Sequence, residues 1–427
     1  MDTACVLPMR IAKRAFSRAY EFRREHGDEQ LIRAERPWPE IGVSAPAFEG
    51  RLGFEPVDLQ SAEIASLCAA CEIDHGIGPV PGTRGGSVAG LARWTAFLSA
   101  GVESYHRRRN DPAIVPPQGA SRISPYLHHG HLSPFRVARE AAAIGGAGAE
   151  KFLDELLVWR ELAHNFCLFN EPLAGGLECL DRLPDWAQST LREHRNDERV
   201  ADYDWERLAR GQTGDPLWDA AQRSLQIHGE LHNNLRMTWG KALLDWTATP
   251  ARALALMVDL NHRYALDGND PNSYAGLLYC LGLFDRPFMP EQPVIGKVRA
   301  RPTRAHLKRL DLVTYRTRMN TRGDGKMHRV AVVGAGMSGL AAARTLKDQG
   351  FAVTVLERAR KVGGRTAHRK RGEHVFDHGA QYFTARDPGF ARHVASWVHA
   401  GLVGPWTGHI VALGEDRIVK EVSPLDR

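Results

Sequence analysis

The sequence contains no apolar run long enough to cross a membrane. Its candidate stretches, Ala253–Leu260 and Ala275–Phe284, are short and bounded by charges, whereas a membrane helix needs about 20 consecutive apolar residues. The opening Met1-Asp2-Thr3 also lacks the basic start and apolar core of a signal peptide. These absences argue against a membrane-spanning or secreted protein and predict a cytoplasmic one, associated with the nucleoid if it binds DNA.

Cysteine is scarce and shows little pattern. The chain has 6 cysteines, and only Cys68 and Cys71 have the CxxC spacing. A structural zinc site would need a second such pair, and a redox CxxC would need a thioredoxin-like βαβ setting. Neither is present around these residues, so we predict reduced structural thiols and no metal site.

The excess of positive charge is small. The chain has 56 Lys and Arg against 50 Asp and Glu, a net charge of +6, which is compatible with nucleic-acid binding without demonstrating it. One basic cluster is His106–Arg109. A second consists of Arg299, Arg301, Arg304, Lys308 and Arg309. A solvated face is the ordinary interpretation of such clusters.

The 427 residues divide into unequal parts. In residues 1–80, Ala4–Met9 is predicted as a buried strand and Ile11–Arg24 as a helix. Residues 81–318 carry apolar positions at helix spacing, as in Lys151–Cys167, and predict an all-α domain. Ser224–Thr247 and the proline-opened Pro250–Tyr264 are two of its predicted helices. Residues 319–328 are a predicted linker.

The pattern changes to α/β in residues 329–427. A buried strand precedes a glycine-rich turn and a helix, and the next strand, Ala352–Leu356, ends at Glu357. The turn has the GxGxxG spacing, formed by Gly334, Gly336 and Gly339. In a Rossmann unit these glycines let the backbone approach a pyrophosphate, and the acidic residue binds a ribose. We therefore predict a partial βαβ unit that could bind FAD or NAD(P).

Three tryptophans stand out among the 10 in the chain. Trp239 and Trp246 are seven residues apart in one predicted helix, which places both rings on the same side, roughly 10 Å apart along the axis. Trp218 lies upstream. Core packing is the usual role of such residues, and the alternative is an electron relay to a buried cofactor.

Larger segments carry a family resemblance. In chain order they are PVPGTRGG, YHRRRNDP, SRISPYLHHGHLSP, WRELAHNFC, DPLWDAAQ, HNNLRMTWGKALLDWT, LNHRYALDGNDPNSYAGLLYCLGLFDRP and IGKVR. Together they cover roughly residues 78–315, which resemble the C-terminal core of class II DNA photolyases. The resemblance implies a helical, FAD-binding catalytic domain that splits cyclobutane pyrimidine dimers in DNA by light-driven electron transfer. It also leads us to expect a monomer.

The resemblance assigns roles to individual residues. The electron-transfer tryptophans would be Trp218, Trp239 and Trp246. Catalytic polar groups would be Glu161, bonded to the flipped dimer, and Asn261, facing the flavin. The FAD-binding set would be Tyr105, Ser121, Ser124, Arg236, Asn261 and Asp267. The DNA-binding set would be Arg122, Met237, Tyr279, Asp285 and Arg286. Without the resemblance, Ser121–Pro125 is an ordinary helix start, Asp267 a turn residue, and Glu161 a partner for Arg160.

Some positions depart from the class II pattern. Tyr279 replaces a tryptophan of the dimer pocket, His232-Asn233 replaces His-Gly, and His164 replaces an aspartate. These departures lie mostly on the substrate side, so FAD binding is the safer expectation and dimer affinity the weaker one.

The two ends resemble pieces of larger domains. Residues 1–80 look like the tail of an α/β antenna domain, and we expect no antenna chromophore. Residues 329–427 resemble the N-terminal part of renalase-like or amine-oxidase-like FAD oxidoreductases. Two other functions therefore stay open: a cryptochrome-like FAD photoreceptor without repair, and an FAD-dependent oxidoreductase acting through a second FAD or NAD(P). The predicted fold is mainly α, with a remnant α/β domain before it and a partial Rossmann unit after it.

Overall fold

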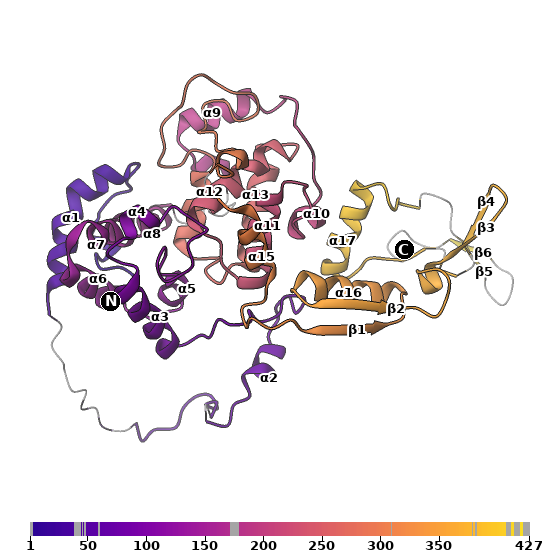
Figure 1. Cartoon of the computed structure of the whole chain (residues 1–427), viewed down its shortest axis with the longest axis horizontal. Coiled ribbons are helices and arrows are strands. Elements are labelled where there is room, and N and C mark those ends of the chain that lie inside the picture. Colours follow the sequence, from indigo (N-terminus) through magenta and orange to yellow (C-terminus); the bar gives the residue numbers. More distant parts are fainter. Residues whose placement is uncertain are drawn as a thin grey trace.

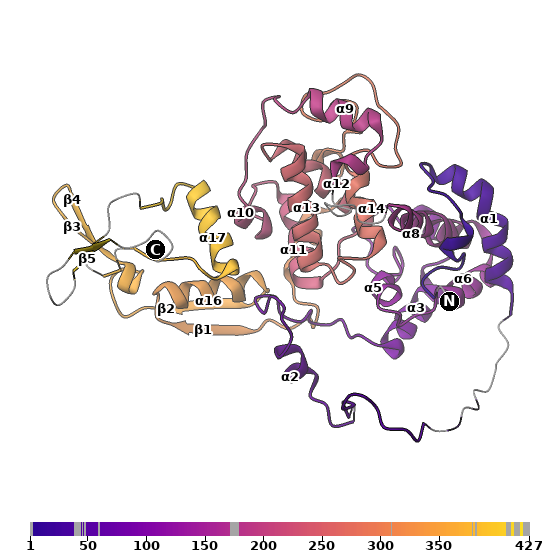
Figure 2. The same ribbon diagram turned by 180° about the vertical axis from the view of Figure 1, so that it is seen from behind.

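The computed structural model of the chain describes residues 3–37, 44, 46, 48–58, 60–170, 179–308, 310–377, 379–380 and 382–406, and the backbone of 411–413 and 419–421. Helices make up most of it, as predicted. Figures 1 and 2 show a helical body at one end and a small α/β unit at the other. Within the described residues, no helix has the length and apolar character needed to span a membrane.

The N-terminal segment differs from its prediction. Residues 5–16 form an irregular stretch with one 3-10 turn, η1 (Met9–Ile11), whose apolar side chains are mostly buried, and the helix that follows is α1 (Ala19–Glu35). The strand predicted at Ala4–Met9 and the helix predicted at Ile11–Arg24 are therefore wrong. The apolar side chains of this stretch pack against Val158 and Leu162, and its backbone N–H groups donate to a buried carboxylate rather than to a neighbouring strand.

The first half of the helical body is a compact aromatic core. Trp94, Phe97, Tyr105 and Phe152 meet with ring centroids 5.3 to 5.8 Å apart, and burial of such rings is a large apolar contribution. The elements are α3 (Ser87–Ala100), α4 (Tyr105–Arg108), α5 (Ser124–His128), α6 (Pro134–Ile144), α7 (Gly146–Leu153), a π turn (Asp154–Trp159) and α8 (Arg160–Phe169). The short helix α2 (Ile64–Ala69) lies apart from them, with all its residues exposed (Figures 1 and 2).

The second half is built around a larger apolar cluster. Its elements are η3 (Leu180–Arg182), α9 (Asp185–Glu193), α10 (Trp205–Ala209), α11 (Pro216–His228), α12 (Asn233–Asp245), α13 (Pro250–Tyr264), α14 (Pro271–Tyr279), η4 (Thr303–Ala305) and α15 (Leu312–Asn320). The proline-opened helix has the predicted bounds. Ser224–Thr247, however, is not one helix, because Gly229 adopts φ 63° and ends α11 while His232 caps α12.

The C-terminal unit contains the predicted βαβ arrangement. Strands β1 (Arg329–Val333) and β2 (Ala352–Leu356) pair in parallel, and α16 (Met337–Asp348) connects them. Beyond them lie η5 (Gly364–Thr366), the hairpin β3 (His368–Arg371) and β4 (His374–Asp377), helix α17 (Pro388–His399), and the pair β5 (Val411–Leu413) and β6 (Val419–Glu421).

Helices α16 and α17 face the helical body in both views (Figures 1 and 2). Asp348, at the end of α16, accepts from Arg210 Nε at 2.9 Å, and Glu206 accepts from Trp397 Nε1 at 2.9 Å. Arg223 donates to the carbonyl of Asp348 at 2.5 Å. Cations at a helix C-terminus complement its dipole, so α16 is held at its negative end.

The connection between the two parts is shorter than the predicted linker. Helix α15 continues to Asn320, and the following turn, Thr321–Gly325, lies against Pro81 and Gly82. Gly82 has φ +80°, and a Cβ there would collide with the carbonyl of Gly323. Glycine is required at this position both for its backbone conformation and for the close approach.

This contact predicts the effect of adding one methyl group. Gly82→Ala is expected to lower the free energy of unfolding by about 1–3 kcal/mol more than Gly86→Ala, because both positions have positive φ but a Cβ at Gly86 has no heavy atom within 4 Å. Urea denaturation of the two variants measures the difference. Equal destabilisation would show that the Gly82–Gly323 contact contributes nothing.

Candidate functional site: a central cavity and a tryptophan cluster

A cavity of about 620 Å³ opens in the helical body, a size common for small-molecule sites. It is lined by the turn before α5, the α11–α12 turn, the first turns of α12, helix α15 and the turn Thr321–Gly325. Six arginines line it against two carboxylates, Glu230 and Asp267. The arginines are Arg93, Arg109, Arg122, Arg236, Arg318 and Arg322. The lining therefore favours an anionic ligand.

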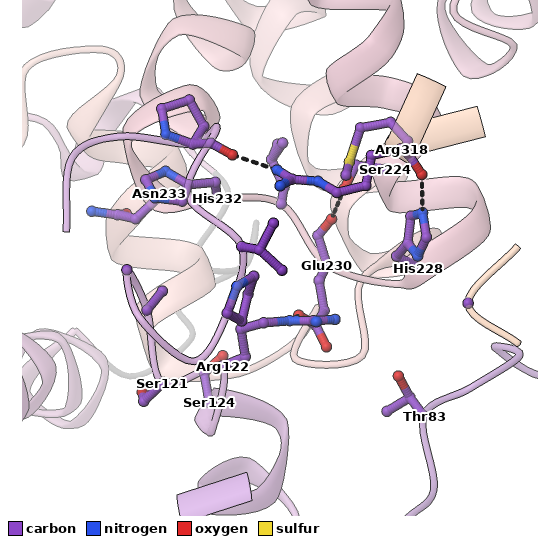
Figure 3. A pocket seen from close by; sticks show the side chains of 18 of the residues that line it. Thr83, Ser121, Arg122, Ser124, Ser224, His228, Glu230, His232, Asn233 and Arg318 are labelled. Carbon is purple, nitrogen blue, oxygen red and sulfur yellow. Dashed lines mark hydrogen bonds and ion pairs between the residues drawn. The ribbon is translucent and has the colours of Figure 1, made fainter. Parts of the chain in front are cut away.

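The turn before α5 supplies hydroxyls and a paired cation. Ser121, Arg122 and Ser124 all line the cavity (Figure 3). Arg122 has φ 54° and forms an ion pair with Glu230, which also binds Arg93 at 3.0 Å. The structure thus places Arg122 in the cavity wall, engaged by a carboxylate, although the resemblance assigned it to DNA.

Arg236 connects the residues assigned to the flavin. Its NH1 donates to Asn261 Oδ1 at 3.2 Å and its NH2 to Asp267 Oδ1 at 3.4 Å. Ser124 Oγ donates to the other oxygen of Asp267 at 2.7 Å. Arg236, Asp267 and Ser124 line the cavity, whereas Asn261 is fully buried behind them and donates to Gly268 O at 2.9 Å. Four of the six predicted FAD-binding residues therefore meet in one network, and the other two, Tyr105 and Ser121, line the same cavity.

Tyr105 also lines the cavity, and burial raises the pKa of its hydroxyl. Its ring lies 5.6 Å from the guanidinium of Arg109. Met237, assigned to the dimer pocket, lines the same cavity one residue after Arg236.

The sequence assigned no role to several cavity residues, and His232 stood out only as a departure from the class II pattern. Burial and the nearby Arg109 lower the pKa of His232 to about 4, so this imidazole is neutral near pH 7. His228 contacts the carbonyl of Arg318 at 3.3 Å (Figure 3). Arg318 donates to the carbonyls of Pro112 at 2.5 Å and Ala113 at 2.9 Å. The N-cap position of His232 was the one local signal that could have pointed to it.

The three tryptophans form a contact chain in an order that spacing alone did not reveal. Trp218 and Trp239 stack with centroids 6.0 Å apart and planes 8° apart, and Trp218 meets Trp246 edge-on at 5.4 Å. Trp218 therefore lies between the other two. Trp218 and Trp239 are buried, while Trp246 is half-buried just beyond the end of α12.

Glu161 has other partners than the predicted dimer. It is buried, and its oxygens accept from the backbone N–H of Val6 at 2.6 Å, from that of Leu7 at 3.2 Å and from Gln30 Nε2 at 2.7 Å. It is absent from the described cavity lining. Arg160 donates to the carbonyl of Ala4 at 2.6 Å, so both residues hold the N-terminal segment.

The remaining DNA-assigned residues form a separate group. Asp285 pairs with Arg299 at 3.0 Å, and the guanidiniums of Arg286 and Arg299 lie 5.1 and 4.4 Å from the ring of Phe288. Tyr279 meets Trp159 edge-on at 6.4 Å. These side chains are not in the lining of the cavity as the structure describes it. Arg309 of the second basic cluster lies outside the described residues.

The glycine-rich turn has the geometry of its motif. Gly334 has φ +99°, and Gly336 caps α16. Glu357 accepts from the backbone N–H of Ala335 and of Ala359, both at 2.7 Å. The carboxylate of Glu357, predicted to bind a ribose, therefore lies against the glycine-rich turn.

Glu161 leads to a pH prediction. Burial raises its pKa to about 7, although hydrogen bonds from Gln30, Val6 and Leu7 oppose the rise. The folded state then binds this proton more tightly than the unfolded state. The stabilisation that this proton on Glu161 adds to the free energy of unfolding is fully present below about pH 4.5 and is lost by about pH 7. The change is about 3 kcal/mol. Glu161→Gln should remove this part of the pH dependence.

Urea denaturation between pH 4.5 and 8 measures the difference between the wild type and Glu161→Gln. Glu150→Gln, which changes an exposed carboxylate of α7, is the control and should keep the wild-type slope. An unchanged slope in Glu161→Gln would contradict the raised pKa.

Comparisons with known proteins find similarities in two parts of the chain. Residues 332–398 match the family described as NAD(P)-binding Rossmann-like domain. Deoxyribodipyrimidine photo-lyase from Methanothermobacter thermautotrophicus is 41% identical over 216 residues, covering 51% of this chain and 46% of the relative. The Arabidopsis thaliana protein of the same name is 37% identical over 269 residues, covering 61% and 52%.

The chain spans about half the length of the curated relatives it matches. A solved class III photolyase from Agrobacterium tumefaciens aligns with 55% of this chain and 45% of its own, at 20% identity and a TM-score of 0.42, which adds nothing to the sequence match. Over about half of its length the chain is thus similar to deoxyribodipyrimidine photo-lyases, which supports the photolyase/cryptochrome family for that part, joined to a Rossmann-like domain.

Proposed function

We propose that this chain repairs cyclobutane pyrimidine dimers in DNA as a light-driven carbon–carbon lyase that uses reduced FAD. The observation that carries the proposal is the geometry of α12. This one helix presents Arg236 and Met237 to the arginine-rich cavity, and it stacks Trp239 on Trp218 within the core. A ligand site and a chain of contacting tryptophans are therefore built on the same rigid element.

The cavity residues fit FAD by their chemistry. The hydroxyls of Ser121 and Ser124 and the surplus of guanidiniums suit a pyrophosphate, and the paired Arg236 and Asp267 offer fixed polar groups to a planar ring. When bound, FAD would supply the photoexcited electron that no side chain can provide. The protein groups would hold it in place and limit its contact with water.

The tryptophan chain suits one-electron transfer to the cavity side of α12. The ring centroids of neighbouring members are 5.4 and 6.0 Å apart. The half-buried Trp246 is the outer member of the chain and the buried Trp239 is the inner one. Electrons entering at Trp246 would thus pass through Trp218.

For DNA, a flipped dimer would have to reach the cavity, at a cost of a few kcal/mol. The cluster around Arg286 and Arg299 would bind phosphates.

The arrangement of Glu161 favours a second candidate. Its carboxylate is tied to Val6, Leu7 and Gln30, and Tyr279 packs on Trp159. Both residues were assigned to the dimer, and neither is in the described cavity lining. An FAD photoreceptor of the cryptochrome type, without repair, would need neither of them.

The C-terminal unit could bind a second FAD or NAD(P) at Gly334–Gly339, as an oxidoreductase would.

The decisive test is repair by the full chain. Purified protein should carry about one FAD per chain from the cavity site and, after reduction, should remove thymine dimers from DNA under blue light and not in the dark. Bound FAD without repair would favour the photoreceptor. Oxidation of amines or NAD(P)H in the dark would favour the oxidoreductase, and a chain that binds no FAD would contradict all three.

Trp239→Phe tests the tryptophan chain. We expect photoreduction of oxidised FAD to slow by at least about tenfold, since one lost contact interrupts the chain, while repair by chemically reduced protein continues. The control is Trp94→Phe, because Trp94 is equally buried but lies in the other aromatic core. Photoreduction that is equally fast in Trp239→Phe and the wild type would rule out this relay.

A further inference from the structure

A second cavity, of about 480 Å³, lies where the C-terminal unit meets the helical body. Its walls come from residues 74–81, from α10 and α13 of the helical body, and from α16 and α17 of the Rossmann-like unit. It contacts the last turns of α16, through Arg344 and Asp348, whereas the glycine-rich turn lies at the opposite end of that helix. Pro81 and Arg322 line both this cavity and the first one.

Three arginines in this cavity have donors to spare. Among the described residues, the guanidinium of Arg392 makes no hydrogen bond, and its nearest carboxylate oxygen, on Asp74, is 3.9 Å away. The buried Nε of Arg263 has no acceptor there either, although its NH2 pairs with Asp259 at 3.1 Å. The buried Nε of Arg322 lies 3.7 Å from Asp324, beyond hydrogen-bond distance. A buried donor without an acceptor is costly.

The surrounding carboxylates are already engaged. Asp348 binds Arg210, Glu206 binds Arg344, and Asp74 forms its short ion pair with Arg263. The lining carries five arginines and two carboxylates, Asp74 and Asp348. The arginines are Arg210, Arg263, Arg322, Arg344 and Arg392. The carboxylates Glu206 and Asp259 stand behind this lining. The surplus of arginines in the lining and the unengaged guanidinium of Arg392 therefore remain to receive an added anion.

Aromatic rings stand beside these donors. The guanidiniums of Arg392 and Arg263 lie 5.0 and 5.4 Å from the ring of Trp205, and His393 meets that ring edge-on at 5.5 Å. Trp205 is itself fixed by its Nε1, which donates to Asp259 at 2.5 Å. On the other side, Arg322 lies 4.2 Å from the ring of Phe351. Rings flanked by guanidiniums are suited to a flat ligand that carries negative charge.

We infer that this cavity is a separate binding site for a small aromatic anion of the nucleoside phosphate class. Arg392 would donate to the phosphate, Arg263 would add positive charge beside it, and the base would lie against Trp205. Since Arg392 belongs to the C-terminal unit and Arg263 to the helical body, the ligand would join the two parts. The site is independent of FAD in the first cavity and of a dinucleotide at the glycine-rich turn.

The test uses the full chain saturated with FAD, titrated with ADP, adenosine or inorganic phosphate in a calorimeter. ADP should bind more tightly than either of the other two, because only ADP engages both the arginines and the ring. Arg392→Met should weaken ADP binding at least tenfold. This variant is informative because Arg392 makes no hydrogen bond to any described residue, so its replacement removes none from the fold.

Two control variants separate the sites. Arg252→Met removes an exposed arginine from α13, the helix of Arg263, and should leave ADP binding unchanged. Glu357→Gln alters the glycine-rich turn and should also leave it unchanged. ADP binding that is lost in Glu357→Gln but kept in Arg392→Met would overturn the inference and assign the nucleotide to the turn. An absence of ADP binding to the wild type, or a preference for phosphate alone, would overturn it as well.

Discussion

The guanidinium of Arg236 holds the central cavity together. It reaches Asn261 on α13 and Asp267 in the turn before α14, and Asp267 in turn receives the hydroxyl of Ser124 from α5. Four chain segments thus depend on one cation that is itself mostly buried. A charged group in such a place must be paired to be tolerated, so the position of each of these side chains constrains the others.

The same helix carries the tryptophan chain. From Arg236 to Trp239 is less than one turn of α12, so any shift that disturbs the cavity network also moves the ring stacked on Trp218. Trp239 is fixed further by its Nε1, which donates to Gln222 at 3.0 Å, and Trp218 by its own, which donates to the carbonyl of Trp239 at 2.9 Å. The proposed electron path is therefore held by hydrogen bonds as well as by packing.

The N-terminal segment and the C-terminal unit are attached to the helical body by polar groups of different kinds. Near the N-terminus, the carboxylate of Glu161 binds two backbone N–H groups. In the C-terminal unit, Asp348 and the end of α16 receive Arg210 and Arg223. The first is the carboxylate of Glu161, whose pKa is raised by burial, so the stability of this attachment depends on pH. The second relies on arginines, which stay charged, and it leaves the arginine-rich second cavity between the two parts.

Local sequence was sufficient for much of the fold. Helix α13 has its predicted bounds because Pro250 and the Thr249 cap are local signals, and the βαβ unit follows from a strand, a glycine-rich turn and a second strand in succession. Local sequence was misleading at Ala4–Met9, where an apolar run indicated a strand, and at Gly229, which divides a predicted helix into α11 and α12.

The sequence by itself determined which residues could carry the chemistry: the three tryptophans, Arg236, Asp267, Ser121, Ser124 and the glycine-rich turn. Only the tertiary structure decided their neighbours. It placed Trp218 between Trp239 and Trp246, bound Arg122 to Glu230, and turned Glu161 toward Val6 and Leu7. The physical reason is that helix and turn signals act over a few residues, whereas Glu161 and Val6 are 155 positions apart and meet only when the whole chain packs.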